Sequence, residues 1–304
     1  MAVYVNTNVS SLNGRRYLNN VQNQLTTTYQ RLSSGLRINS AKDDAAGLQI
    51  SSRLTTQING LNQGNRNASD GIALAQTIEG AMDEMTGMLQ KIRTLAVQAN
   101  NGTNTADDRK ALQKEATALA TEITRIAQQT KFAGGQILDG AYGVMTKGGA
   151  AAGGANSIGK LTLQVGANKG DTISFEVNAM KFSQIAKVGG LDDAALKKFW
   201  SANKGIVLTA AANIADAISG MDKMIAAVDA ARAGLGAMQN RLESSIRNQA
   251  NVSANQADAR SRIRDADFAE ESANLSQQSI IQQAATSMLM QANTRPQLGL
   301  SLLG

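Results

Sequence analysis

An uninterrupted helical pattern runs from Ala45 to Asn100 and leaves this chain few ways to fold. Its apolar residues recur at spacings of three, four or seven: Leu54, Ile58, Leu61, Ala68, Ile72, Ala75, Met82, Met85, Leu89, Ile92, Ala96 and Ala99. No proline interrupts them, so the stretch predicts one helix of about 50 residues, roughly 75 Å long. Only other long helices can bury so long and narrow a stripe, which predicts an elongated helical bundle.

The composition agrees with closely packed helices. Hydrophobic residues make up 42% of the 304 residues, but aromatic residues only 3%. The core must therefore consist of Ala, Leu, Ile, Val and Met, which suit helix packing better than a deep ligand pocket. The single proline, Pro296, permits uninterrupted helices everywhere before it.

The chain contains no cysteine and no histidine. These absences exclude disulfides, thiolate nucleophiles, Ser-His pairs and the HExxH metal motif. No carboxylate pair or lysine stands in a recognisable catalytic motif. We therefore expect no enzyme, with no catalytic residue, no cofactor and no metal.

Net charge is +6 and the isoelectric point is near 9.6, which raises the possibility of nucleic-acid binding. The basic residues are scattered and lack interleaved aromatics, so a solvated basic surface is the favoured interpretation. No run of 18 apolar residues occurs, and we expect no membrane insertion. The first twelve residues lack the basic leader and apolar core of a secretory signal peptide.

The two ends of the chain carry matching apolar stripes. In the first segment the stripe comprises Leu18, Val21, Leu25, Tyr29, Leu32 and Leu36. In the last helix it comprises Leu275, Ile281, Ala285, Met288 and Ala292. Residues 1–42 contain five basic residues and no acidic one, a net +5, whereas residues 255–304 have a net −1. These charges favour pairing of the two ends as a coiled coil.

The rest of the chain alternates helical and extended patterns. Gly35 is expected to end the first helix, and Thr105 with Asp108 to start a helix that runs back antiparallel to about Thr130. A Gly/Ala-rich linker at 146–159 precedes two alternating segments that predict a β-hairpin across GANKGD, and a short helix is expected within 191–203. Helical phase returns from Ile206.

The sequence thus predicts a mostly α fold, a long antiparallel helical bundle or coiled coil with a small β-containing domain in the middle. We expect three parts: a terminal coiled coil (1–42 with 255–304), a helical body (43–144 with 206–254) and a small outer domain (145–205). Extra apolar positions beside the main stripe, such as Ile280, Ala284 and Leu289, predict packing among many subunits.

Several stretches closely resemble bacterial flagellin. They are VNTNVSSLN at 5–13, RLSSGLRINSAKDDAAGLQISSRL at 31–54, NASDGIALAQTIEGAM at 67–82, LGAMQNRLESSI at 235–246 and ARSRIRDADFAEESANLS at 259–276. The match is long and nearly gap-free over roughly 1–140 and 206–303. It implies a subunit of the helical flagellar filament for swimming, with both termini lining an inner tube and the middle of the chain outside.

The resemblance also implies partners. Flagellins leave the cell partly unfolded through the flagellar type III export channel, with a chaperone on the C-terminal helix, here 265–303, and they meet filament cap and hook–filament junction proteins. A vertebrate innate immune receptor senses flagellin on a stretch matched here by Leu89, Gln90, Lys91, Arg93 and Leu95, with Glu115 on the neighbouring helix. Cytosolic sensors read C-terminal leucines that Leu300, Leu302 and Leu303 resemble.

Three alternatives stay open at this stage. A hook–filament junction protein of the same superfamily would share the terminal helices, although the terminus QQAATSMLMQAN at 282–293 favours the filament. A basic coiled-coil nucleic-acid binder would show affinity that falls steeply with salt. An enzyme inserted in the middle would have only about 60 residues, and a histidine-based metalloprotease is impossible.

Overall fold

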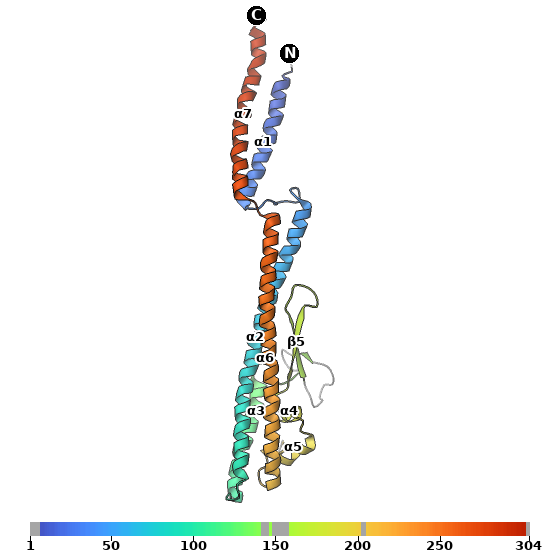
Figure 1. Ribbon diagram of the computed structural model, residues 1–304, viewed down its shortest axis with the longest axis vertical. Coiled ribbons are helices and arrows are strands. Elements are labelled where there is room, and N and C mark those ends of the chain that lie inside the picture. Colours follow the sequence, from blue (N-terminus) through green and yellow to red (C-terminus); the bar gives the residue numbers. More distant parts are fainter. Residues whose placement is uncertain (1–6, 141–145, 148–157, 202–204, 302–304) are drawn as a thin grey trace. The chain divides into compact units, whose positions relative to one another are not determined.

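A computed structural model of the chain describes residues 7–140, 146, 147, 158–201 and 205–301 (Figure 1). The helices are α1 (Val9–Ser34), α2 (Ala45–Ala99), α3 (Ala106–Gln129), α4 (Phe182–Val188), α5 (Asp193–Phe199), α6 (Ala211–Arg264) and α7 (Phe268–Ser301). The strands are β1 (Lys131–Phe132), β2 (Gly135–Gln136), β3 (Thr146–Lys147), β4 (Ile158–Gln164), β5 (Thr172–Asn178), β6 (Trp200–Ser201) and β7 (Gly205–Ile206). The predicted mostly helical fold is confirmed, and the helix predicted from Ala45 spans 55 residues.

The chain divides into two compact units. The terminal unit comprises Met1–Ile58 and Val252–Gly304, and the central unit comprises Asn59–Asn251. Helices α2 and α6 each contribute residues to both units. The finer three-part division expected from the sequence stays a prediction.

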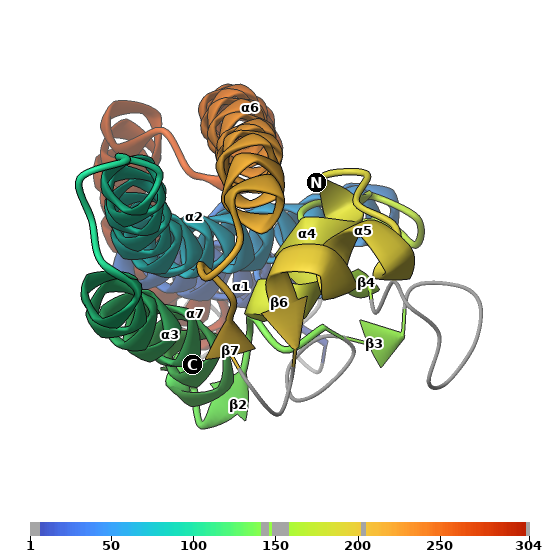
Figure 2. The same ribbon diagram turned by 90° about the horizontal axis from the view of Figure 1, so that it is seen from below.

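In the central unit, α2, α3 and α6 lie side by side (Figure 2). Their contact is built from aliphatic and methionine side chains that are fully buried, among them Leu74, Ile78, Met82, Met85, Leu89, Ile92, Ile123, Ile214, Met221, Met224 and Leu242. The predicted capping box at the start of α3 is confirmed, because the Thr105 hydroxyl accepts a hydrogen bond from the Asp108 N–H at 3.2 Å and the Thr105 N–H donates to the Asp108 carboxylate at 2.9 Å.

The predicted β-hairpin is confirmed as the antiparallel pair β4–β5, in which Leu161 lies opposite Phe175. Phe175 and Val177 are buried in the same apolar core as α2 and α6. The expected short helix is α5, whereas α4 was not predicted because a seven-residue helix carries too little periodicity to recognise. The segment from β4 to β6 therefore shares its core with the helical bundle of the central unit.

In the terminal unit, α1 ends at Gly35, which adopts a left-handed conformation with φ of 69°, as predicted. Two backbone hydrogen bonds join the following turn to the end of α6. The Arg37 N–H donates to the Arg264 carbonyl at 2.7 Å, and the Ala266 N–H donates to the Gly35 carbonyl at 3.0 Å. These backbone bonds hold the start of α7 beside the end of α1. Within the described ranges, no helix has the length and apolar character needed to cross a membrane.

Candidate functional site

Helices α1 and α7 run antiparallel side by side and form the seam of the terminal unit (Figure 1). Val21, Leu25 and Ala285 are buried in it. The sequence also placed Leu18, Leu32, Leu275, Ile281 and Met288 there; the first four are half-buried, whereas Met288 is 68% exposed. Tyr29 was expected in the seam and is 58% exposed, because Thr28 occupies the heptad position between Leu25 and Leu32.

Polar side chains accompany this seam from end to end. The Asn8 amide donates to the Ala292 carbonyl at 2.7 Å, and the Gln282 amide donates to Gln22 Oε1 at 2.7 Å. The Thr28 hydroxyl donates to Gln278 Oε1 at 3.2 Å. Arg31 Nη1 meets Glu271 Oε1 at 2.9 Å, and the Glu271 side chain is only 9% exposed. This last pair realises the charge complementarity that the sequence predicts between the two ends.

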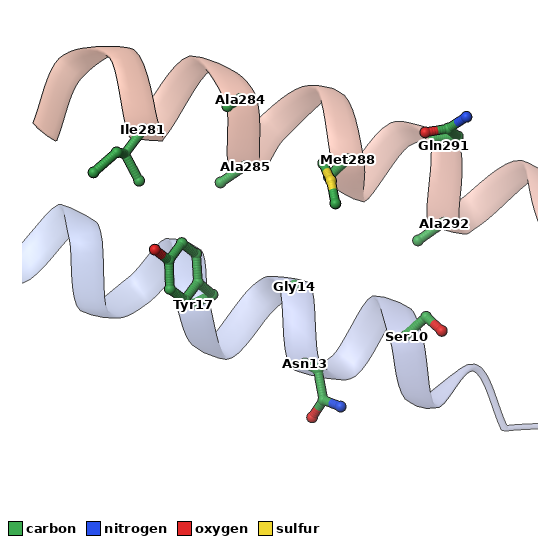
Figure 3. A pocket seen from close by; sticks show the side chains of 10 residues that line it. All are labelled: Ser10, Asn13, Gly14, Tyr17, Ile281, Ala284, Ala285, Met288, Gln291 and Ala292. Carbon is green, nitrogen blue, oxygen red and sulfur yellow. The ribbon is translucent and has the colours of Figure 1, made fainter. Parts of the chain in front are cut away.

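A groove of about 740 Å³ opens along one side of the seam. It is lined by Ser10, Asn13, Gly14, Tyr17, Ile281, Ala284, Ala285, Met288, Gln291 and Ala292. Figure 3 shows Ala285, Met288 and Ala292 pointing from α7 toward α1, where Gly14 presents no side chain. None of the ten lining residues is acidic or basic. We call this surface the terminal groove.

Large apolar side chains are exposed mainly on the two helices of this seam. Of the twelve exposed large hydrophobic residues in the described part of the chain, eight belong to α1 or α7: Val9, Leu12, Tyr17, Tyr29, Phe268, Ile280, Met288 and Met290. The exposed fractions of the last three are 67%, 68% and 65%. Exposed apolar residues scattered singly are normal, but their concentration on two adjacent helices indicates an interaction surface.

A second candidate surface lies in the central unit on α2, α3 and α6. Gln90 and Lys91 are exposed, and Lys91 Nζ forms an ion pair with Glu115 Oε1 at 3.0 Å. Arg93 Nε contacts Asp222 Oδ1 of α6 at 2.6 Å, a partner that the sequence alone did not suggest. The other two predicted residues of this stretch, Leu89 and Leu95, are 0% and 7% exposed and belong to the core. Only the polar members are thus available to a partner.

The leucines at the chain end stand at the edge of what the structure describes. Leu300 lies within α7, and Leu302 and Leu303 lie outside the described residues. Elsewhere in the described ranges, no three His, Cys, Asp or Glu side chains cluster as metal ligands would.

Shifted pKa values occur at exposed, structural positions. The pKa of Asp108 is lowered by hydrogen bonds from the Thr105 hydroxyl and N–H at the start of α3. In α3, the hydrogen bond from Arg125 lowers the pKa of Glu122, and the same bond raises the pKa of Arg125. These shifts have local causes and indicate helix stabilisation instead of acid–base chemistry.

Comparison with known proteins assigns the family. A model of the bacterial flagellin N-terminal helical region matches residues 5–142, and a model of the C-terminal helical region matches residues 218–303. Flagellin B of Vibrio cholerae serotype O1 is 36% identical and flagellin A of Vibrio anguillarum is 37% identical, each over 378 residues and 100% of both chains. A solved structure of a putative flagellar hook-associated protein from Vibrio parahaemolyticus shares the fold, with a TM-score of 0.55 at 17% identity over 73% of this chain and 100% of that one. With matches at both ends and full-length relatives, this chain belongs to the bacterial flagellin family.

Proposed function

We propose that this protein is an extracellular subunit that assembles with copies of itself into the helical flagellar filament used for swimming. The observation that carries the proposal is the concentration of exposed apolar side chains on α1 and α7. The full-length relatives are flagellins, which favours a filament subunit over the hook–filament junction protein that the sequence left open.

The seam alone covers too little of these helices. Ordering each residue costs about 1–2 kcal/mol of backbone conformational entropy, and a two-helix contact buries only one face of each helix. The terminal groove and the exposed positions around it, such as Ile280 and Met288, gain burial only from another molecule. A surface that repeats on every copy and does not close on itself generates a helical polymer.

Within the filament, the terminal coiled coil (1–42 with 255–304) lines the inner tube, the helical body (43–144 with 206–254) surrounds it, and 145–205 faces outward. Support comes from the family models, which match both ends and leave 143–217 unmatched.

Export follows the flagellar type III route, with a chaperone that covers the C-terminal helix until the subunit reaches the tip. The exposed apolar residues of α7 are the chemical reason for such a cover, since they would otherwise promote premature association. The filament cap and the hook–filament junction proteins are the expected partners at the two ends of the polymer.

The vertebrate innate receptor for flagellin binds the exposed polar residues Gln90, Lys91, Arg93 and Glu115. In this chain Lys91 and Glu115 already neutralise each other, and a lysine offers no bidentate contact. The cytosolic sensors read Leu300, Leu302 and Leu303. Each of these assignments rests on the family resemblance.

Assembly can be tested with two neighbouring substitutions on α7. Ala284→Asp places a carboxylate in the terminal groove, whereas Gln283→Asp places the same charge on the adjacent residue, which does not line the groove. Both positions are exposed, so neither monomer should lose stability. Burying an unpaired carboxylate costs several kcal/mol, so Ala284→Asp should raise the critical concentration about a hundredfold or more.

The measurement is elongation of preformed seeds, followed by light scattering and electron microscopy. The proposal requires Gln283→Asp to elongate seeds far better than Ala284→Asp. Equal elongation by both variants would show that the terminal groove stays open to solvent in the polymer.

A further inference from the structure

The methionines of this chain fall into two groups by exposure. Of the eleven in the sequence, six described ones are buried in the central unit: Met82, Met85, Met180, Met221, Met224 and Met238. Met88 is half-buried there. Met288 and Met290 are 68% and 65% exposed, and both lie on α7. The chain has no cysteine, so methionine is its only sulfur-containing residue.

The two exposed methionines differ in where they point. Met288 lines the terminal groove and points toward α1 (Figure 3). Met290 is not among the lining residues, because two further residues turn it about 200° around the helix. The two methionines are therefore almost equally exposed to solvent, but only Met288 lines the terminal groove.

We propose that Met288 is an oxidation site at which a two-electron oxidant, such as hydrogen peroxide, switches off assembly of the free subunit. This inference rests on the proposed function. The thioether sulfur attacks one peroxide oxygen, the O–O bond breaks, a sulfur–oxygen bond forms and water leaves after proton transfer. Sulfur is oxidised by two electrons to the sulfoxide, and the peroxide is reduced.

The sulfoxide changes the chemistry of the terminal groove. It replaces a flexible apolar group by a strongly polar, chiral acceptor. When another molecule covers the groove, this oxygen loses water in a lining that combines aliphatic residues such as Ile281 and Ala285 with the polar side chains of Ser10, Asn13, Tyr17 and Gln291. Removing water from the strongly polar sulfoxide costs more than removing it from a thioether, so the contact weakens and the critical concentration should rise about tenfold.

The arrangement makes the effect selective and reversible. The six buried methionines of the central unit are shielded from the oxidant, so the packing of its core survives. In the polymer Met288 is covered, so the filament resists an oxidant that inactivates free subunits. Methionine sulfoxide reductases reverse the modification and should restore assembly.

The test treats full-length monomer with dilute hydrogen peroxide, quantifies each sulfoxide by peptide mass spectrometry and measures seed elongation. For each variant the readout is the ratio of the treated to the untreated rate. Wild type and Met290→Leu should lose elongation in proportion to oxidation at residue 288, while the ratio for Met288→Leu stays near one. Reductase treatment should return the wild-type rate.

A second variant needs no oxidant. Met288→Gln places a polar amide at the same site and should raise the critical concentration about tenfold, whereas Met290→Gln should not. The inference is overturned if protein fully oxidised at residue 288 elongates at the untreated rate, or if Met288 oxidises equally fast in filaments and monomers. Failure of the untreated wild type to elongate seeds at all would instead overturn the proposed function, and this inference with it.

Discussion

Asp43 closes the turn between α1 and α2 with a single carboxylate oxygen. Its Oδ2 accepts hydrogen bonds from the Asn39 N–H at 3.1 Å, the Ser40 N–H at 2.9 Å and the Ser40 hydroxyl at 3.2 Å. These bonds, the Ser40 N–H foremost, hold the pKa of Asp43 below its ordinary value. A carboxyl whose pKa is lower in the folded protein stabilises the fold above its unfolded pKa, about 3.9, and loses that contribution as the pH falls through the folded value.

Asp43→Ala should therefore lower the stability of the terminal unit at neutral pH. The difference in unfolding free energy between the variant and wild type should shrink below about pH 4. Protonation of Asp43 there removes the contribution of the ionised carboxylate from wild type. Ser40→Ala is the control, since it removes only the hydroxyl donor and leaves both backbone donors in place, so its effect should be smaller. Urea unfolding at a series of pH values measures this. A difference for Asp43→Ala that stays constant down to pH 2 would contradict the assignment.

The sequence predicts that α1 ends at Gly35, but it does not show how the turn after Gly35 is held together. Asp43 and Asp44 both stand just before α2, where a carboxylate accepts hydrogen bonds from the free N–H groups of the first turn. The structure gives only Asp44 that role, because its Oδ1 accepts from the Gly47 N–H at 2.9 Å. Which of two adjacent carboxylates turns back to the loop depends on loop geometry, and spacing along the chain does not encode it. The same limit applies to Thr28, where a polar residue replaces the expected aromatic one in the seam.

At the scale of the element, the five glycines of α2 that belong to the central unit have two distinct environments. A Cβ on Gly60 would lie 2.7 Å from the Cβ of Ala167, one on Gly64 would overlap the Val165 carbonyl, and one on Gly71 would overlap the Leu163 side chain. Gly80 and Gly87 have nothing within 4 Å. Spacings of four and seven place the first three on one face of the helix, where the hairpin β4–β5 packs closely.

Alanine substitutions should separate the two environments. Gly87→Ala should stabilise the central unit by about 0.5–1 kcal/mol, because alanine favours the helix and nothing obstructs its methyl group. Gly64→Ala should destabilise it, since the obstructing atom is backbone and the hairpin must move. Thermal unfolding followed by circular dichroism gives both signs. A Gly64→Ala variant as stable as wild type would mean that the hairpin does not rest on α2.

The sequence predicted both of these elements and not their contact. Periodicity identified the helix and alternation identified the hairpin, because each signal is local. The sequence does not explain the glycines of α2, because their role becomes visible only when the segment that packs against them is known. The candidate surfaces likewise combine features that local sequence predicts with features that it does not. Residue spacing predicts the stripes of α1 and α7. It does not predict the ion pair of Arg93 with Asp222, because these residues are 129 positions apart.

For the molecule as a whole, the middle of the chain matters to the stability of the central unit. Phe199 of α5 is 1% exposed, and its ring rests on α6 where a Cβ on Gly220 would lie 2.6 Å from its Cζ atom. The Phe182 and Trp200 rings are 5.8 Å apart beside it. From sequence, the change of pattern at 145–205 indicated a separate part, because a shared core leaves no mark in local periodicity.

Phe199→Ala should consequently destabilise the whole central unit, by about 3–5 kcal/mol. Lys197→Ala, on the exposed side of the same helix, should change stability by less than about 0.5 kcal/mol. Urea unfolding monitored by the helical signal distinguishes the two. If 145–205 folds on its own outside the bundle, Phe199→Ala will leave the helical transition where it was.

The hydrogen-bonded pairs along the α1–α7 seam have a consequence for fidelity. An apolar stripe with a heptad repeat does not by itself fix the register of two helices. If one helix shifts by seven residues along the other, apolar residues again face apolar residues. Arg31 and Glu271 remove that degeneracy, since displacement would leave a nearly enclosed carboxylate without its counter-charge. Thr28 with Gln278 and Gln22 with Gln282 penalise the same error at two further points. These pairs thus select one register of α1 against α7 within each subunit. A subunit in the wrong register would present an altered surface to the next subunit, and the error would pass along the polymer.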